Sequence, residues 1–388
     1  MKINRIGIAG QAGFGVGIAP RLPAGYTALP GTFDVESPEY GNYRYDDGSV
    51  MAYVPRFDVA FKEGHPHIVG VDQVAPADSH LVRMPAFFND GKWRDGFFYD
   101  KYLCSNNNGI ASSIKGGRVL SSRRRADHPL TPFSSLGGGI QDNYGGGFDA
   151  AKTRGKDFFV SSLQMRIALG MLVVAQREAA TAQTCEWLNA DRRWPVGCTN
   201  WERGDKRMPG LIYEPDGTFD GCGLTGSANS PAAVSHNGQE CGVMDLNGLV
   251  WEIQSGIGER DGELAFISEA DALESFHLDT WKAHPSRACM PDKTGWNFID
   301  PTRINGDGIL NAITGQDCGA GGLWVPSKTP KGLCVISGVS GPTARAPGSG
   351  RCIWTVCAAT RATTLGSVPP LSCDMSPLAK ASGRFLSK

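Results

Sequence analysis

The chain of 388 residues lacks any apolar run long enough to cross a membrane. Its longest such run, residues 167–175, lies between Arg166 and Arg177, whereas a membrane-spanning helix needs roughly 20 apolar residues. We therefore expect a buried core helix here and no membrane insertion. The first ten residues also lack a hydrophobic segment of signal-peptide length and a cleavage site, so export by that route is not expected.

Net charge is nearly absent as well. Lysine and arginine total 38 against 39 acidic residues, which gives a formal net charge of -1 and no electrostatic footprint for nucleic acid. The chain has no serine nucleophile elbow and no His-Glu-x-x-His helix, and no catalytic carboxylate pair stands out. We predict that it is not an enzyme.

The 11 cysteines include no Cys-x-x-Cys pair, which argues against a zinc ribbon or a thioredoxin-type motif. Disulfides are the more natural interpretation, and they do not normally persist in the cytosol. The alternative is a cytosolic protein with reduced, buried cysteines. Cys185 with Cys198 and Cys222 with Cys241 are sequence-local pairings, but spacing alone does not fix connectivity.

Glycine (51 residues) and proline (24 residues) are plentiful, which favours short strands and long loops in an α+β fold. The length favours two domains. Residues 116–147 hold three glycine clusters and the arginine triplet 123–125, a composition typical of a linker or exposed loops. We place the boundary there, between a β and coil docking or oligomerisation segment, 1–125, and a second domain, 126–388.

Periodicity predicts several elements. Ser161 or Ser162 can cap a helix whose apolar residues recur at spacings of three and four through Val174, and a capping-box pattern begins a second helix at Ser268. Strands are expected at 49–54, 67–71, 96–99, 322–325, 333–337 and 352–359. Residues 10–17 are rich in glycine but match no phosphate-binding motif, so we expect an extended arm that packs on a neighbouring subunit.

Residues 243–253 carry the sharpest pattern in the chain, an Asp-x-x-Gly-x-Val-Trp-Glu run formed by Asp245, Gly248, Trp251 and Glu252. After the turn, Leu249, Trp251 and Ile253 alternate with Val250, Glu252 and Gln254, as in a half-buried strand. The run resembles the signature of the formylglycine-generating-enzyme and C-type-lectin-like superfamily. A second segment, residues 352–361 with Trp354 and Arg361, is similar to the terminal strand of that family.

The resemblance implies a loop-rich, C-type-lectin-like C-terminal domain of the formylglycine-generating-enzyme type. It also implies that Cys357 would pair with Cys373 near the terminus. Copper oxidase chemistry in that family uses two cysteines, and here Cys352 falls at the second position while Pro347 occupies the first. The missing thiolate makes the oxidase an unfavoured alternative.

Metal ligands are not identified by the sequence. Asn305–Ile309 is similar to the turn of a calcium loop but lacks the acidic residue of an EF-hand, and His65 and His67 have no evident third ligand. We expect no cofactor, with structural calcium left open.

A protein that is made without a signal peptide, yet is suited to disulfides, fits a phage virion component released by lysis. The lectin-like scaffold is also used by phage receptor-binding proteins. We therefore predict a virion protein of the tail, collar or capsid. It would form a homo-oligomer, which we predict to be a homotrimer, and assemble with other virion proteins. It would also bind a host-surface polysaccharide or protein receptor.

The predicted ligand-binding residues are Trp324, Arg345, Ser349 and Arg351, around the segment 337–354. A purely structural, disulfide-stapled decoration protein is the other alternative.

Overall fold

In a computed structural model of the chain, the described part is sheet-rich and has two α-helices, which confirms the mainly β and irregular α+β class. The helices are α1 (Tyr144–Lys152) and α2 (Leu163–Ala179). The structure describes residues 5–63, 65–89, 92–122, 131–188, 195–197, 210–215, 217, 223–246, 249 and 252–256, together with the backbone of Trp251 and of the strands that follow residue 256.

A five-stranded sheet forms the centre of the N-terminal part. Its order is β1 (Tyr26–Ala28), β2 (Asn42–Tyr45), β3 (Val50–Pro55), β9 (Gly96–Asp100) and β26 (Arg384–Phe385). All five residues of β9 are buried, as are the last five of β3, so both faces of these central strands are covered. Strand β26 comes from the end of the chain and pairs antiparallel with β9.

A seven-stranded sheet gathers most of the C-terminal strands. Its order is β21 (Ile313–Thr314), β20 (Gly295–Ile299), β22 (Gly322–Val325), β24 (Val356–Thr360), β23 (Leu333–Ser337), β16 (Trp251–Gln254) and β25 (Pro377–Ala379). The predicted strands at 322–325 and 333–337 are confirmed, and the strand predicted over 352–359 is assigned as β24. The Asp-x-x-Gly-x-Val-Trp-Glu run thus enters the sheet through β16.

The remaining strands form small sheets. Three-stranded sheets have the orders β5 (His65–Gly70), β4 (Phe57–Lys62), β6 (His80–Arg83), and β17 (Ile257–Arg260), β18 (Glu263–Phe266), β19 (Arg287–Cys289). The pairs are β7 (Phe88–Asn89) with β8 (Lys92–Trp93), β10 (Ser105–Asn107) with β11 (Ile110–Ser112), β12 (Leu120–Ser121) with β13 (Thr131–Pro132), and β14 (Tyr213–Pro215) with β15 (Gly223–Ala228). Single 3-10 turns lie at η1 (Pro85–Phe87), η2 (Phe133–Leu136), η3 (Glu186–Leu188) and η4 (Pro231–Val234).

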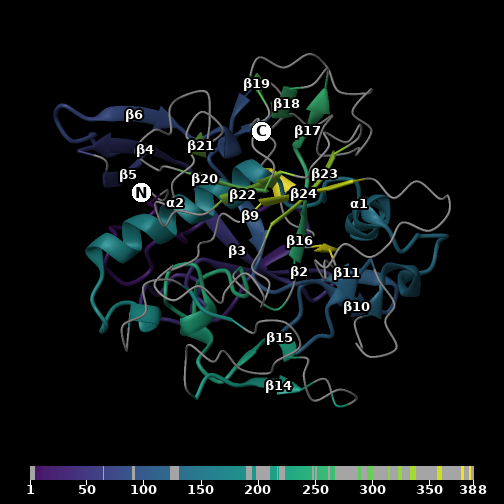
Figure 1. Cartoon of the computed structure of the whole chain (residues 1–388). Helices are drawn as coiled ribbons and strands as arrows, with labels where there is room; N and C mark the ends of the chain where they lie inside the picture. The colour runs from purple at the N-terminus through teal and green to yellow at the C-terminus, as the bar shows by residue number, and fades with distance from the viewer. Residues whose placement is uncertain are drawn as a thin grey trace.

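Helix α2 is the buried core helix that the apolar run predicts. Ser162 is its N-cap, and the Ser162 hydroxyl accepts a hydrogen bond from the Met165 amide at 3.2 Å. The helix lies beside β5 (Figure 1), and every residue from Leu163 to Gln176 is buried. No described helix is long and apolar enough to cross a membrane.

The prediction of a linker or exposed loops over residues 116–147 is wrong for its last part. Gly145, Gly146 and Gly147 are buried in the first turn of α1, and the Asn143 side chain caps that turn by accepting from the Gly146 amide at 2.9 Å. A Cβ atom at Gly146 would overlap the Gln141 carbonyl, so the close approach of the chain requires glycine there. The triplet 123–125 lies outside the described residues.

The expected extended arm at residues 10–17 is also wrong, because this segment packs into the core of its own chain. Phe14 and Val16 are fully buried, as is Ile6 before them. Gly15 has a φ of +84°, and a Cβ there would collide with the His236 ring. The side-chain Nδ2 of Asn237 donates to the Phe14 carbonyl at 2.7 Å, which fixes the segment against residues far along the chain.

The largest hydrophobic cluster draws side chains from both sides of residue 125. It includes Val54 and Phe97 of the central sheet, Leu169 and Leu172 of α2, and Trp187. The predicted boundary between 1–125 and 126–388 therefore does not divide this core. Strand β26 adds a backbone connection across the same boundary.

Candidate functional site

Asp245, the first residue of the sequence motif, is fully buried and has a φ of +59°. Its carboxylate accepts hydrogen bonds from the Tyr213 hydroxyl (3.0 Å), the Thr225 hydroxyl (3.0 Å) and the Gly226 amide (2.7 Å). Tyr213 lies on β14, and the other two donors lie on β15. Asp245 therefore ties the β14–β15 hairpin to the segment that leads into β16.

Glu252, the last residue of the motif, is fully buried and pairs with an arginine of the core helix. The Arg166 Nη1 atom lies 2.9 Å from Glu252 Oε1, and Arg166 Nη2 donates to the Leu246 carbonyl. The half-buried strand expected here is wrong, because Glu252 and Gln254 are as completely buried as Ile253. The α2 side of β16 is covered, and the ion pair makes the buried glutamate tolerable there.

The two carboxylates give the motif a structural role within this chain. Asp245 and Glu252 each join segments that are distant in sequence, and neither is open to solvent. For Trp251 only the backbone in β16 is described, and Gly248, Trp354 and Arg361 lie outside the described residues.

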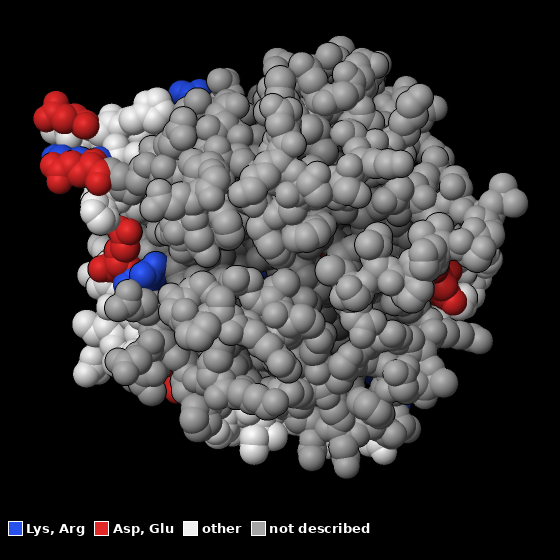
Figure 2. Space-filling view, viewed as in Figure 1, with Lys and Arg blue, Asp and Glu red and all other residues white. Residues whose placement is uncertain are grey.

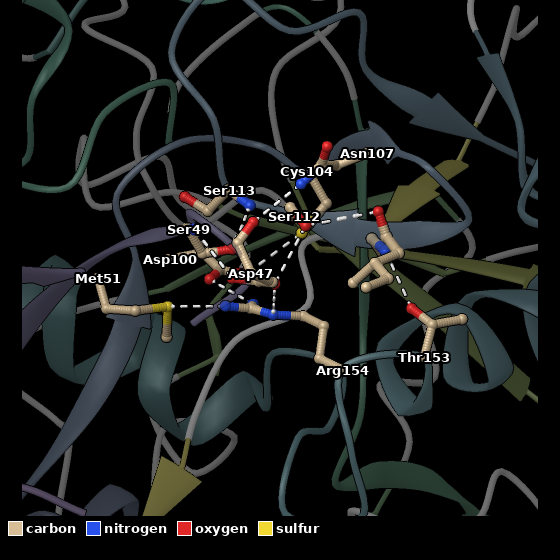
Figure 3. Close-up of polar contacts among 12 residues, drawn as sticks. Asp47, Ser49, Met51, Asp100, Cys104, Asn107, Ser112, Ser113, Thr153 and Arg154 are labelled. Carbon is tan, nitrogen blue, oxygen red and sulfur yellow. Dashed lines mark hydrogen bonds and ion pairs between the residues drawn. The ribbon is translucent and has the colours of Figure 1, made fainter. Parts of the chain in front are cut away.

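A second buried polar cluster surrounds Arg154, which follows the end of α1 (Figure 3). Arg154 Nε lies 3.0 Å from Asp47 Oδ2, and Nη1 lies 2.7 Å from Asp100 Oδ1. The guanidinium stacks over the Phe158 ring, with 4.2 Å between its central carbon and the ring centroid, and donates to the Met51 sulfur at 3.3 Å. The cluster fastens α1 to β3 and β9, and no sequence motif marks it.

Asp100 is the most perturbed acid of this cluster. Its pKa is raised to about 6 by burial, and the Arg154 guanidinium opposes the rise. The Cys104 thiol donates to Asp100 Oδ2 at 3.2 Å, while Asp47 accepts from the Ser49 amide (2.8 Å) and the Ser112 hydroxyl (3.0 Å). Asp100 can take up a proton near neutral pH, but it is fully buried and the Asp47 side chain is only 5 % exposed, so we assign the cluster to the scaffold.

The cysteines correct part of the disulfide prediction. Cys185 and Cys241 are both free thiols and buried, so the pairings with Cys198 and Cys222 are not formed in this structure. Burial raises the pKa of Cys185 to about 12 and also raises that of Cys241, which disfavours the reactive thiolates. Both are core residues of the largest hydrophobic cluster. Cys198, Cys222 and Cys373 lie outside the described residues, and Cys357 is described only as backbone in β24.

Of the predicted ligand-binding residues, Trp324 alone lies in the described part, and only as backbone. Trp324 lies in β22, where its backbone is opposite Trp296 of β20 and Cys357 of β24. Arg345, Ser349 and Arg351 lie outside the described residues, as does the turn Asn305–Ile309.

Metal ligands do not cluster within the described residues, where no group of three or more His, Cys, Asp or Glu side chains could hold an ion. His65 and His67 lie exposed on β5, and His65 Nδ1 contacts Glu178 Oε2 at 3.2 Å. In the view of Figure 2, described acidic and basic side chains lie beside one another at the edge that carries β4, β5 and β6. That edge has mixed charge, in keeping with the balanced composition.

Comparison with models of known protein families and with curated protein sequences finds no match.

Proposed function

We propose that the chain is a structural protein of a phage particle that attaches to a host-surface ligand through lectin-like loops. The observation that carries the proposal is the burial of both motif carboxylates, Asp245 and Glu252, in contacts that hold the scaffold together. Because the two motif carboxylates hold the scaffold together, we assign ligand recognition to the loops between strands. Function on a rigid scaffold is commonly carried by such loops.

The ligand in this proposal is a host polysaccharide or protein, and the loop is the segment 337–354 after β23, together with Trp324. The particle would carry the chain as a homo-oligomer beside other virion proteins. The copper oxidase remains the less favoured alternative, because Pro347 stands where the family has its first active-site cysteine. The three described thiols, Cys104, Cys185 and Cys241, are buried.

The test is binding of the purified full-length protein to a panel of bacterial cells and surface polysaccharides, with calcium and then with chelator. We expect saturable binding to one surface, lost when residues 337–354 are replaced by a neutral linker of equal length. The matched control replaces residues 72–78, an exposed loop between β5 and β6, and should bind normally. Absence of binding by folded protein would contradict attachment and favour a decoration role. Oxygen consumption with a cysteine peptide and copper would favour the oxidase.

A further inference from the structure

A cavity of about 370 Å³ opens on the surface beside the N-terminal segment, and none of its described lining residues belongs to the sequence motif. Four stretches of chain line it: Ala12, residues 35–38, residues 183–184 and residues 239–241. Its size is at the lower end of the range for sites that bind small molecules, about 300–1,000 Å³. Nothing in the predicted lectin-like site includes these residues.

One side chain ties three of the walls together. Gln239 Oε1 accepts from the Gly13 amide at 2.7 Å, and Gln239 Nε2 donates to the Gln11 carbonyl at 2.9 Å and to the Thr184 carbonyl at 3.2 Å. Both ends of the amide are thereby used, so its orientation is fixed. The walls at residues 11–13, 184 and 239 are held in one arrangement without a ligand.

Two buried side chains fix the rest of the cavity. Asn42 Nδ2 donates to the Cys241 and Tyr40 carbonyls, each at 2.8 Å. Lys101 Nζ donates to the Pro38 carbonyl at 3.2 Å and contacts Glu39 Oε2 at 3.5 Å. A cavity held by such contacts loses little conformational freedom when a ligand enters, which favours binding.

The charge of the cavity is negative. Among the described residues that line the cavity, the charged ones are Glu36 and Glu240, and both are exposed. Lys101 lies behind the wall with its side chain 2 % exposed and contacts a third carboxylate, Glu39. Among these described groups, one ammonium stands against three carboxylates, which leaves an excess of negative charge at the mouth.

The rest of the lining supplies neutral hydrogen-bonding groups and a small apolar surface. Ser37, Gln183 and Thr184 carry hydroxyl and amide groups, while Val35 and Pro38 are apolar. A ligand that suits this wall has a cationic group for the two glutamates and hydroxyl or amide groups for the other side chains.

We propose that this cavity is a binding site for a small, hydroxyl-bearing ligand with a protonated amino group, of the amino-sugar type. The proposal does not rest on the loops assigned to host attachment. Protein in which residues 337–354 are replaced should still bind such a ligand.

The experiment compares three sugars that share one ring: glucosamine, N-acetylglucosamine and glucose. Their dissociation constants for the full-length protein are measured by titration, followed through ligand-observed NMR. We expect glucosamine to bind most tightly and its affinity to fall with added salt, because only its amine is charged. Equal affinity for glucosamine and glucose, or no binding of glucosamine at millimolar concentration, would overturn the proposal.

Variants locate the site. Glu36→Gln and Glu240→Gln should each weaken glucosamine binding about threefold, and the double variant about tenfold, since each removes one partly solvated charge contact. Glu214→Gln, an exposed acid on β14 that does not line the cavity, is the matched control and should leave binding unchanged. Ala12→Trp, which fills the cavity, should abolish binding. Full affinity in the double variant, or in a folded Ala12→Trp protein, would show that the sugar binds elsewhere.

Discussion

The two described helices are each anchored by one buried arginine, but the two arginines are neutralised differently. Arg154, just after α1, meets two carboxylates, Asp47 and Asp100. Arg166, within α2, meets one carboxylate, Glu252, and the Leu246 carbonyl. The first anchor holds one positive charge against two negative ones, whereas the described partners of the second are one carboxylate and one carbonyl.

This difference gives the two anchors different responses to pH. An excess carboxylate in a buried site favours the protonated form, and burial raises the pKa of Asp100 to about 6. Around Arg166, the ion pair with Glu252 joins α2 to β16. The α1 anchor is therefore the one whose strength should change between pH 5 and pH 7.

The largest effect is expected from breaking the Arg166–Glu252 pair. Arg166→Met leaves the Glu252 carboxylate buried without its cation, and such a loss costs about 3–5 kcal/mol of unfolding free energy. Urea unfolding followed by circular dichroism measures it. Arg154→Met should cost less at pH 5 than at pH 7, because at pH 5 Asp100 takes up a proton and removes one of the two negative charges left behind.

Two further variants control this measurement. Arg166→Met with Glu252→Met removes both charges and should recover most of the loss, because the site becomes apolar. Arg44→Met on β2, where the arginine is exposed, should change the unfolding free energy by less than about 0.5 kcal/mol. A double variant as unstable as Arg166→Met alone would mean that the lost packing, and not the unpaired carboxylate, causes the effect.

The second prediction concerns Asp100→Asn and pH. Because the pKa of Asp100 rises from 3.8 to about 6 on folding, the folded protein holds this proton more tightly than the unfolded chain does. The associated stability is fully present below about pH 4 and is lost as the pH rises through 6. The shift corresponds to a change of about 3 kcal/mol across this window.

The measurement is the unfolding free energy of wild type and Asp100→Asn at several pH values from 4 to 7.5. The asparagine variant lacks this proton, so the wild-type advantage should shrink as the pH rises. A constant difference between the two proteins over the whole range would show that Asp100 stays ionised in the folded state, held by Arg154.

Local patterns were sufficient to predict many of the elements. The strands β3, β5 and β9 and the helix α2 were predicted from short segments of the sequence, and the N-cap of α2 is Ser162, one of the two serines that the sequence offered. The motif also marked Asp245 and Glu252 as structural residues, although their partners could not be read from it.

The anchors themselves depend on contacts between distant residues, which a single sequence does not reveal. Arg154 meets Asp47 and Asp100 across 107 and 54 positions, and Arg166 meets Glu252 across 86. The glycines of α1 were predicted to lie in a linker or exposed loop for a related reason. Glycine is a poor helix former, and only the close approach to Gln141 explains why the helix needs it. For Arg166, the sequence showed only that a charged residue directly precedes the apolar run 167–175, and it did not show the partner.

The smallest predicted effect separates the N-caps of the same two helices. Ser162 is 3 % exposed, so Ser162→Ala leaves the Met165 amide without a partner and out of reach of water, at a cost of about 1–2 kcal/mol. Asn143 is exposed, so in Asn143→Ala water can replace the lost contact with the Gly146 amide, at about 0.5 kcal/mol. Ser162→Thr and Asn143→Ser keep the capping oxygen and should restore most of each loss in urea unfolding. A larger loss from Asn143→Ala than from Ser162→Ala would mean that α1 relies on its cap, and that Arg154 holds the far end of α1 less firmly than the ion-pair geometry indicates.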